Sequence, residues 1–259
     1  MYILELIQPG DCLGYQDRDL AAKLENLLGH LESAFCDANI ALNFFLLEFS
    51  NGPSKITSEQ YRQELEERKI IHHQVCQELG DQTHANYDKI RFEVDRRFKT
   101  EKWKNGELPK SHQHRIKFLH ARSFLYALDN IDKFLKVLAN SDGAPQRIAE
   151  LHLQLKSDFP DLTGVRNTSH HMEDRARGLD AQKVPQPLKL KPVNADFIVG
   201  SQGDLILDNL HGSKYGCTKA NGYYGVVDVS LDSLLKVQSI IQNVFDAFEW
   251  VGFRHHLPR

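Results

Sequence analysis

The sequence predicts a mainly α-helical fold, an antiparallel helical bundle with a small β-rich meander inserted before the C-terminal helix. Long runs in which apolar residues recur at three- and four-residue steps predict the helices, and the short loops between them favour antiparallel packing. The composition agrees, since 41% hydrophobic and 26% charged residues are typical of a folded globular domain. After residue 178 the pattern changes to proline-containing and short β-rich segments.

Four long helical patterns account for most of the N-terminal part. Leucine and phenylalanine recur through residues 17–48, and the SNGPS loop ends this run. A second pattern covers residues 57–104, where TSEQ resembles a capping box and residues 80–81 mark an expected break. A third covers residues 112–139. A fourth begins at residue 145, meets a kink or short break at SDFPDLTG and then resumes to about residue 177.

The last third of the chain carries a different pattern. Residues 181–229 hold a proline-containing linker and then short β-rich runs, which Gly and Asn-Gly turns separate. Residues 230–250 form an amphipathic pattern that begins at a serine cap. We therefore expect a helical bundle over residues 1–180, the linker and β-rich insertion over 181–229, and a C-terminal helix over 230–259 that packs on the bundle.

The sequence shows no pattern typical of a membrane-spanning helix or a secretory signal, so we expect a cytoplasmic protein with no membrane partner. The longest apolar run, IALNFFLLEF, is shorter than the ~20 residues that a membrane-spanning helix needs, and Asn43 and Glu48 interrupt it. The N-terminal MYILELIQPGD has no basic segment before its apolar residues, unlike a secretory signal. The four cysteines lie far apart without a CxxC pair, which argues against a disulfide framework or a zinc finger.

Charge is unevenly distributed, although the net charge of the whole chain is only −3. Residues 89–122 carry eleven Lys and Arg against four Asp and Glu, so this stretch is +7 and the remainder is −10. Two interpretations stay open, a solvated helical hairpin or a surface that faces a polyanion. On the second interpretation, the side chains expected to contact RNA are Arg96, Arg97, Lys99, Lys102, Arg115, Lys117 and Arg122.

One segment, LTGVRNTSHHMEDRARG at residues 162–178, concentrates chemically versatile side chains. Arg166 and Asn167 precede the adjacent His170 and His171, and we call residues 166–171 the Arg–His motif. In an α-helix, Arg166 and His170 lie one turn apart on the same side, whereas His171 is rotated away by about 140°. A purely structural interpretation also stays open, because charged residues of this segment can form helix-surface ion pairs worth about 0.2–0.5 kcal/mol each.

The pattern Arg166-Asn167-x3-His171 resembles the signature of HEPN domains, an arginine and a polar residue followed by a histidine after four to six intervening positions. The resemblance covers residues 15–180 and extends to the final helix, whereas residues 195–229 lie outside the common core of the family. HEPN domains are helical bundles, and many look like metal-independent ribonucleases in which two motifs meet across a symmetric dimer. The resemblance therefore implies a homodimer that cleaves RNA without a metal ion or other cofactor.

Cleavage of RNA without a metal ion explains the residue types of the motif. A base must take the proton of the ribose 2′-OH, an acid must protonate the leaving 5′-oxygen, and histidine suits either task. A guanidinium group suits the charge that gathers on the phosphate. The resemblance assigns proton transfer to His171, phosphate stabilisation to Arg166 and an orienting role to Asn167. His170 has the better helical spacing from Arg166, so it stays a second candidate or a phosphate contact.

Family analogy also suggests a toxin or phage-defence role with an antitoxin or another regulatory protein as partner. The alternative function is a non-catalytic HEPN-type module that binds RNA or protein. A third possibility is an unrelated all-α scaffold whose charged faces bind protein, and it predicts little salt-dependent affinity for RNA.

Three weaker patterns favour structure over chemistry. His72 and Cys76 lie one helical turn apart, but without a second ligand pair we expect them to pack rather than to bind a metal. The FRHHLPR segment at residues 253–259 has the pattern of a flexible tail. The tyrosines of the β-rich insertion suit either stacking on bases or cover of a hairpin, namely Tyr215, Tyr223 and Tyr224.

Overall fold

The computed structural model describes residues 1–50, 57–80, 86–182, 186–195, 198–201 and 203–259. The chain forms two compact units. Met1–Glu48 and Lys117–Arg259 make up what we call the first unit, and Phe49–Ile116 make up the α2–α3 unit. These units do not follow the expected boundaries at residues 180 and 229, because a segment within the expected bundle is compact by itself.

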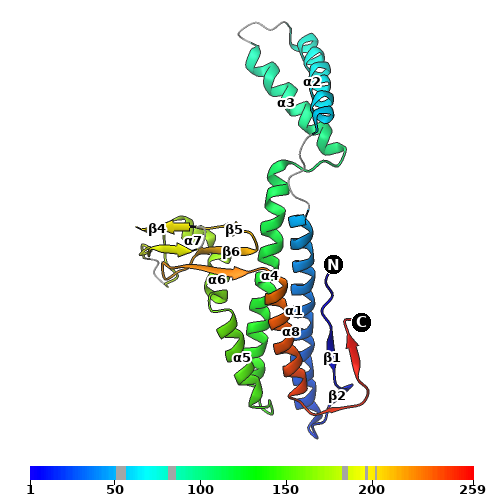
Figure 1. The fold of residues 1–259 in the computed structure, drawn as a ribbon, viewed down its shortest axis with the longest axis vertical. Helices are drawn as coiled ribbons and strands as arrows, with labels where there is room; N and C mark the ends of the chain where they lie inside the picture. Colours follow the sequence, from blue (N-terminus) through cyan, green and yellow to red (C-terminus); the bar gives the residue numbers. More distant parts are fainter. Residues whose placement is uncertain (51–56, 81–85, 183–185, 196–197, 202) are drawn as a thin grey trace. The chain divides into compact units, whose positions relative to one another are not determined.

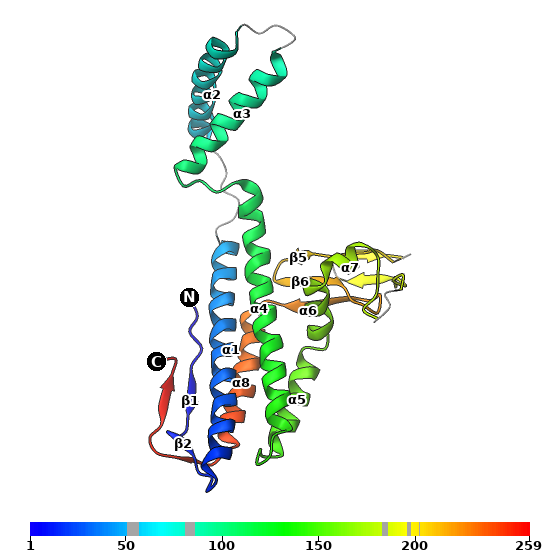
Figure 2. The same cartoon turned by 180° about the vertical axis from the view of Figure 1, so that it is seen from behind.

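Four helices build the core of the first unit (Figures 1 and 2): α1 (Arg18–Ser50), α4 (Lys110–Ala139), α5 (Arg147–Asp158) and α8 (Leu231–Asp246). The start of α4 belongs to the α2–α3 unit. The apolar positions of these helices recur every three or four residues, so each helix presents one continuous apolar stripe. The expectation of a mainly α-helical fold is confirmed.

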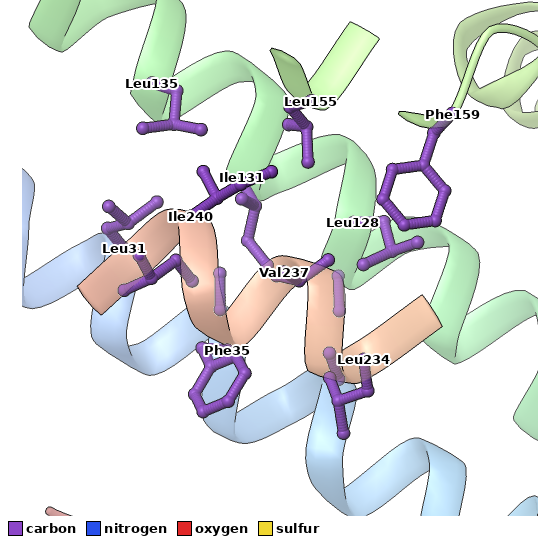
Figure 3. Close-up of a cluster of buried hydrophobic side chains, with 14 of the residues drawn as sticks. Leu31, Phe35, Leu128, Ile131, Leu135, Leu155, Phe159, Leu234, Val237 and Ile240 are labelled. Atoms are coloured by element: carbon purple, nitrogen blue, oxygen red, sulfur yellow. The ribbon is translucent and has the colours of Figure 1, made fainter. Parts of the chain in front are cut away.

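The stripes meet in one large core (Figure 3). Leu31 of α1, Ile131 of α4 and Val237 of α8 lie together in it and are fully buried. Leu155 of α5 packs in the same cluster, so the closing helix does pack on the helices that precede it. Burial of large aliphatic side chains stabilises a fold by about 1.5–3 kcal/mol each relative to exposure.

Short strands join the two ends of the chain. Strand β1 (Leu6–Gln8) pairs antiparallel with β9 (His255–Leu257), and β2 (Cys12–Leu13) pairs antiparallel with β8 (Trp250–Val251). The side-chain amide of Gln242 accepts from the backbone N–H of Ile7 and donates to its carbonyl, which ties β1 to α8. The expectation of a flexible tail at residues 253–259 is therefore wrong, because backbone pairing orders its central residues.

The β-rich insertion is confirmed as a meander. A three-stranded antiparallel sheet contains β5 (Asn209–His211), β6 (Lys214–Thr218) and β7 (Tyr224–Asp228). A separate two-stranded ladder pairs β3 (Val193–Ala195) with β4 (Ile198–Gly200). The break expected at SDFPDLTG is observed, since α5 ends at Asp158 and α6 (Leu162–His170) begins after it, whereas the further division into α6 and α7 (Met172–Ala176) was not expected.

The break between α6 and α7 has a local cause. His171 has φ −114° and ψ 47°, which lies outside the helical region and ends α6. The expected continuation of the last helix to residue 250 also fails, since α8 ends at Asp246 and Trp250 begins β8. The side chain of Trp250 donates to the carbonyl of Phe245, which turns the chain back along the helix end.

The α2–α3 unit is a hairpin of α2 (Ser58–Leu79) and α3 (Tyr87–Lys104). Thr57 and Gln60 form the expected capping box. The expected break is confirmed at Gly80, which has φ 84°, a conformation that glycine adopts at little cost, while residue 81 lies outside the described residues. Among the described helices of the chain, none combines the length and the apolar character that a membrane crossing requires.

Candidate functional site

The Arg–His motif occupies the second half of α6 and the break that follows it. The side chains of Asn167, His170 and His171 are exposed, whereas that of Arg166 is 21% exposed. The opposite face of α6 is buried, with Val165 and Thr168 fully enclosed. The helix therefore presents the chemically versatile residues on one side and packs with the other.

The meander holds the buried face of α6. Thr168 Oγ1 donates to the carbonyl of Thr218 at 3.1 Å, and Ser169 Oγ lies 3.0 Å from the hydroxyl of Tyr215. Burial raises the pKa of Tyr215 well above its usual range, and it raises the pKa of the Cys217 thiol to about 12. These buried neutral side chains fix the rotation of α6, so the β-rich insertion supports the motif.

An ion pair anchors the start of α6 to the same sheet. Asp161, directly before the helix, pairs with Lys219, and its other oxygen accepts from the N–H of Val226 at 3.1 Å. A Cβ atom at Gly225 would lie 3.0 Å from the Asp161 carboxyl carbon and 2.8 Å from Lys219 Cδ. The close approach therefore favours glycine at this position.

Arg166 is held by a carboxylate that the sequence pattern did not reveal as a site residue. Its Nε lies 2.9 Å from Oδ2 of Asp129 on α4, and the Asp129 side chain is only 3% exposed. The N–H direction does not meet hydrogen-bond geometry, so the contact is an ion pair rather than an aligned hydrogen bond. Lys133 Nζ contacts the same Asp129 oxygen at 2.5 Å, which supplies a second positive charge.

The outer edge of the Arg166 guanidinium remains partly available. Its Nη1 donates to Oδ1 of Asn167 at 3.2 Å, and its Cζ lies 5.7 Å from the ring centroid of Tyr126. Within the part of the chain that the structure describes, Nη2 makes no hydrogen bond. Asp129 and Tyr126 thus position the arginine while leaving donors for an anion.

Aromatic contacts connect Tyr126 to the two histidines. The rings of Tyr126 and His170 meet edge to face at 6.1 Å, and those of His170 and His171 meet edge to face at 5.2 Å. His171 Nδ1 lies 3.6 Å from Oε1 of Glu173. The structure therefore places Arg166, Tyr126 and His170 on one continuous surface, which His171 extends toward α7.

A mixed group of metal-ligand side chains begins at the same histidine. Single donor atoms of His171, Glu173 and Asp174 all lie within 4.8 Å of one another. Asp174 Oδ1 also accepts from Arg177 at 2.5 Å. The side chains of His72 and Cys76 lie against each other, with Cys76 Sγ 3.8 Å from both ring nitrogens of His72.

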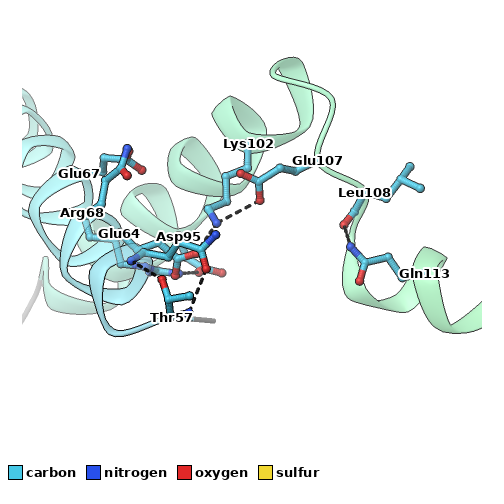
Figure 4. A network of polar contacts seen from close by, with 11 residues as sticks. Thr57, Glu64, Glu67, Arg68, Asp95, Lys102, Glu107, Leu108 and Gln113 are labelled. Carbon is cyan, nitrogen blue, oxygen red and sulfur yellow. Dashed lines mark hydrogen bonds and ion pairs between the residues drawn. The ribbon is translucent and has the colours of Figure 1, made fainter. Parts of the chain in front are cut away.

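The basic side chains of α3 that were expected to contact RNA are already paired with carboxylates. Arg97 pairs with Glu78 of α2 and with Glu93, while Lys102 pairs with Glu64 of α2 and with Glu107 (Figure 4). Arg96 likewise pairs with Glu93, and Lys99 pairs with Asp95. Much of the positive charge of this helix is therefore compensated locally.

The other three expected RNA contacts, Arg115, Lys117 and Arg122, come from α4. Arg122 Nε donates to the carbonyl of Phe118 at 3.3 Å. Among the tyrosines, Tyr215 is buried under α6, so it cannot stack on a base, whereas Tyr223 is exposed. RNA contact by the seven basic side chains stays a prediction.

Comparisons with family models, curated proteins and solved structures find no match for this chain. The HEPN resemblance therefore rests on the Arg–His motif and on its place in a late helix of a mainly α-helical chain. A functional proposal has to rest on the same residues and on the geometry around Arg166.

Proposed function

We propose that this chain is a HEPN-like, metal-independent endoribonuclease. One observation carries the proposal. Arg166 is anchored from behind by the buried Asp129 and retains guanidinium donors beside the exposed His170 and His171. A fixed guanidinium next to an imidazole supplies the two functions that metal-free RNA cleavage requires, stabilisation of phosphate charge and proton transfer.

The proposed reaction is attack of a ribose 2′-OH on the adjacent phosphodiester. The 2′-oxygen forms a bond to phosphorus while the bond from phosphorus to the 5′-oxygen breaks, which leaves a 2′,3′-cyclic phosphate and a 5′-hydroxyl. His171 takes the 2′-OH proton, and the leaving 5′-oxygen receives a proton from a second imidazole. Arg166 binds the non-bridging oxygens, and Asn167, which accepts from Arg166, orients the guanidinium.

A homodimer fits the exposure of the motif. The His171 side chain is 55% exposed, whereas electrostatic catalysis is strongest where water is excluded. A second copy that brings its own Arg–His motif against the first would enclose the site and supply the second imidazole. An antitoxin or other regulatory partner and a toxin or phage-defence role follow from the family resemblance, and they extend the proposal together with the cytoplasmic location that the sequence pattern predicts.

The first experiment is RNA cleavage in EDTA by purified wild-type protein, with mixed single-stranded RNA and tRNA as substrates. We expect Arg166→Lys and His171→Asn to reduce the rate by about 10²–10⁴-fold, because one removes the guanidinium fork and the other the proton carrier. Arg166→Lys is chosen over alanine because it keeps a positive charge beside the buried Asp129. Circular dichroism checks that each variant is folded.

The chain offers a matched control for the histidines. His255 and His256 form a second adjacent pair, distant in sequence from the motif, and His256 is likewise exposed beside a glutamate, Glu5. His256→Asn should leave the cleavage rate unchanged. Comparison of His170→Asn with His171→Asn assigns the proton carrier. Cleavage that survives both histidine substitutions and Arg166→Lys would refute the proposed site.

The second candidate function is a non-catalytic module that binds RNA or protein. The open exposure of both histidines favours it, because a binding surface does not need the enclosure that catalysis needs. Such a module predicts no cleavage, and salt-dependent RNA affinity that Arg166→Lys retains in large part. A fluorescence anisotropy titration at two salt concentrations distinguishes the two functions.

A further inference from the structure

We infer that the connection between α6 and α7 binds a Zn²⁺ ion through His171, Glu173 and Asp174, and that the bound ion switches off RNA cleavage. The binding part stands on the geometry of these three side chains. The inhibitory part rests on the proposed function, because it concerns the same imidazole.

The spacing of the donor atoms fits a zinc ion. Tetrahedral zinc with ligand bonds of about 2.0–2.2 Å places neighbouring donors about 3.3–3.6 Å apart. His171 Nδ1 and Glu173 Oε1 already lie 3.6 Å apart, and one donor atom of Asp174 lies within 4.8 Å of a donor atom of each of these residues. A shift of about 1 Å by one exposed carboxylate would complete the three-ligand arrangement.

The helix break creates this spacing. His171 leaves the helical conformation and its backbone turns the chain into α7, where Glu173 and Asp174 follow within one turn. In one continuous α-helix, residues 171, 173 and 174 would be separated by about 100° per residue, so 171 and 173 would diverge by roughly 200°. The break brings the imidazole and the Glu173 carboxylate to the same side.

The donor set selects the class of metal. One imidazole nitrogen with two carboxylate oxygens suits borderline ions such as Zn²⁺, whereas Mg²⁺ and Ca²⁺ prefer oxygen ligands alone. Three protein ligands leave a coordination position for water or for an RNA phosphate oxygen. Zn²⁺ is therefore the probe, and Mg²⁺ is the contrasting ion.

Arg177 competes with the ion. Its guanidinium holds one oxygen of Asp174 at 2.5 Å, and it adds a positive charge next to the proposed site. Removal of this guanidinium should strengthen zinc binding. The ion pair of Arg147 and Glu150 on α5 serves as the control, because its residues are also three positions apart. Among the described residues, it belongs to no metal-ligand group.

Zinc at Nδ1 would stop the proton transfer. A neutral imidazole has one basic nitrogen and one N–H, so an ion on the basic nitrogen leaves only the protonated nitrogen. His171 then cannot accept the 2′-OH proton. No bond of the RNA is made or broken by the ion, and chelation restores the free imidazole.

Calorimetric titration of ZnCl₂ into EDTA-treated and desalted protein tests the binding part without RNA. We expect one site whose affinity falls at least about tenfold in each of His171→Asn, Glu173→Gln and Asp174→Asn. His256→Asn is the control, because it removes an exposed histidine that lies beside one glutamate, Glu5. It should leave the zinc affinity unchanged. Arg177→Gln should raise the affinity severalfold, whereas Arg147→Gln should not.

The site would be overturned if wild type bound no zinc, or if all three ligand variants bound zinc with the affinity of wild type. The inhibitory part is tested by RNA cleavage with ZnCl₂ or MgCl₂ and then with added EDTA. Zinc should stop cleavage reversibly and magnesium should not. A zinc-bound protein that still cleaves RNA at the full rate overturns the inhibition. A protein that binds zinc but never cleaves RNA retains the metal site and contradicts the proposed function.

Discussion

The two units of this chain are stabilised by different interactions. The first unit encloses a large aliphatic and aromatic core, in which Phe35, Phe124 and Phe245 are almost completely buried. Among the described residues of the α2–α3 unit, the buried core cluster consists of Val75, Ile90 and Val94. Ion pairs between α2 and α3 surround this small core, and Arg68 covers the ring of Phe98 at 4.1 Å.

The difference determines how each unit should respond to solution conditions. Apolar burial does not depend on protonation, so the core of the first unit is insensitive to moderate changes in pH. Ion pairs require ionised carboxylates, and salt screens them when they are exposed. Trp250 lies in the first unit and Trp103 in the α2–α3 unit, and these are the two tryptophans of the chain. Single-tryptophan variants therefore report on each unit separately.

The largest effect should come from the core of the first unit. Phe124→Ala is expected to lower the free energy of unfolding by about 3–5 kcal/mol, because it removes a fully buried ring and leaves a cavity. Urea denaturation followed by Trp250 fluorescence in a Trp103→Phe background measures this loss. Leu119→Ala on the same helix is the control, since Leu119 is exposed and its loss should change stability by no more than about 0.5 kcal/mol. A loss below about 1 kcal/mol for Phe124→Ala would contradict the assigned core.

A smaller effect should follow from acid, and it should be concentrated in the α2–α3 unit. Hydrogen bonds from Arg96 and then Arg97 lower the pKa of Glu93 to about 2, Arg97 lowers the pKa of Glu78, and Lys99 and Arg68 lower that of Asp95. Since the folded-state pKa values are depressed, the stabilisation is fully present above the unfolded values, which are 4.5 for the two glutamates and 3.8 for Asp95. It is lost as the pH falls from about 4.5 toward 2.

Urea midpoints between pH 6 and pH 2.5, followed by Trp103 fluorescence in a Trp250→Phe background, measure that loss. The same series with Trp250 as reporter should change less. Equal shifts of both reporters would show that the ion pairs do not distinguish the two units.

The smallest effect should come from one ion pair. A double-mutant cycle with Lys102→Met and Glu64→Gln should give a coupling free energy of about 0.2–1 kcal/mol, because this pair joins α2 to α3 while partly shielded. The coupling should decrease in 1 M NaCl. The exposed pair of Lys69 and Glu66 within α2 is the control and should couple more weakly. Coupling that is equally strong in both pairs and indifferent to salt would contradict an electrostatic connection between the helices.

Much of the fold follows from the sequence pattern because helical periodicity is a local property. The helices α1, α2, α3 and α4 were expected close to their observed limits, as was the meander, and α8 was expected close to its observed start. The terminal strands were not expected, since β1 and β9 contain three residues each and pair with a partner about 250 residues away in sequence. The break at His171 was also missed, because no glycine or proline marks it.

The candidate site was predictable only in part. The Arg–His motif is visible along one helix, but Tyr126 and Asp129 come from α4 and reach Arg166 only through tertiary packing. The sequence did contain a signal for Asp129 as a buried charge that needs a partner, because it lies between Leu128 and Ile131 in the apolar stripe of its helix. The charge count of residues 89–122 overestimated the available positive charge, since Glu64 and Glu78 lie outside the counted stretch and neutralise it from α2.

The stacking of Phe44 on His120, with ring centroids 5.3 Å apart, places the point where the chain leaves the first unit beside the point where it returns. Residues 49–116 are therefore an insertion into a fold that is continuous without them. A peptide of about five residues has the reach to join such neighbouring helix ends. The hairpin can accordingly be excised or exchanged for a foreign domain, which would be joined to the end of α1 and to the start of α4.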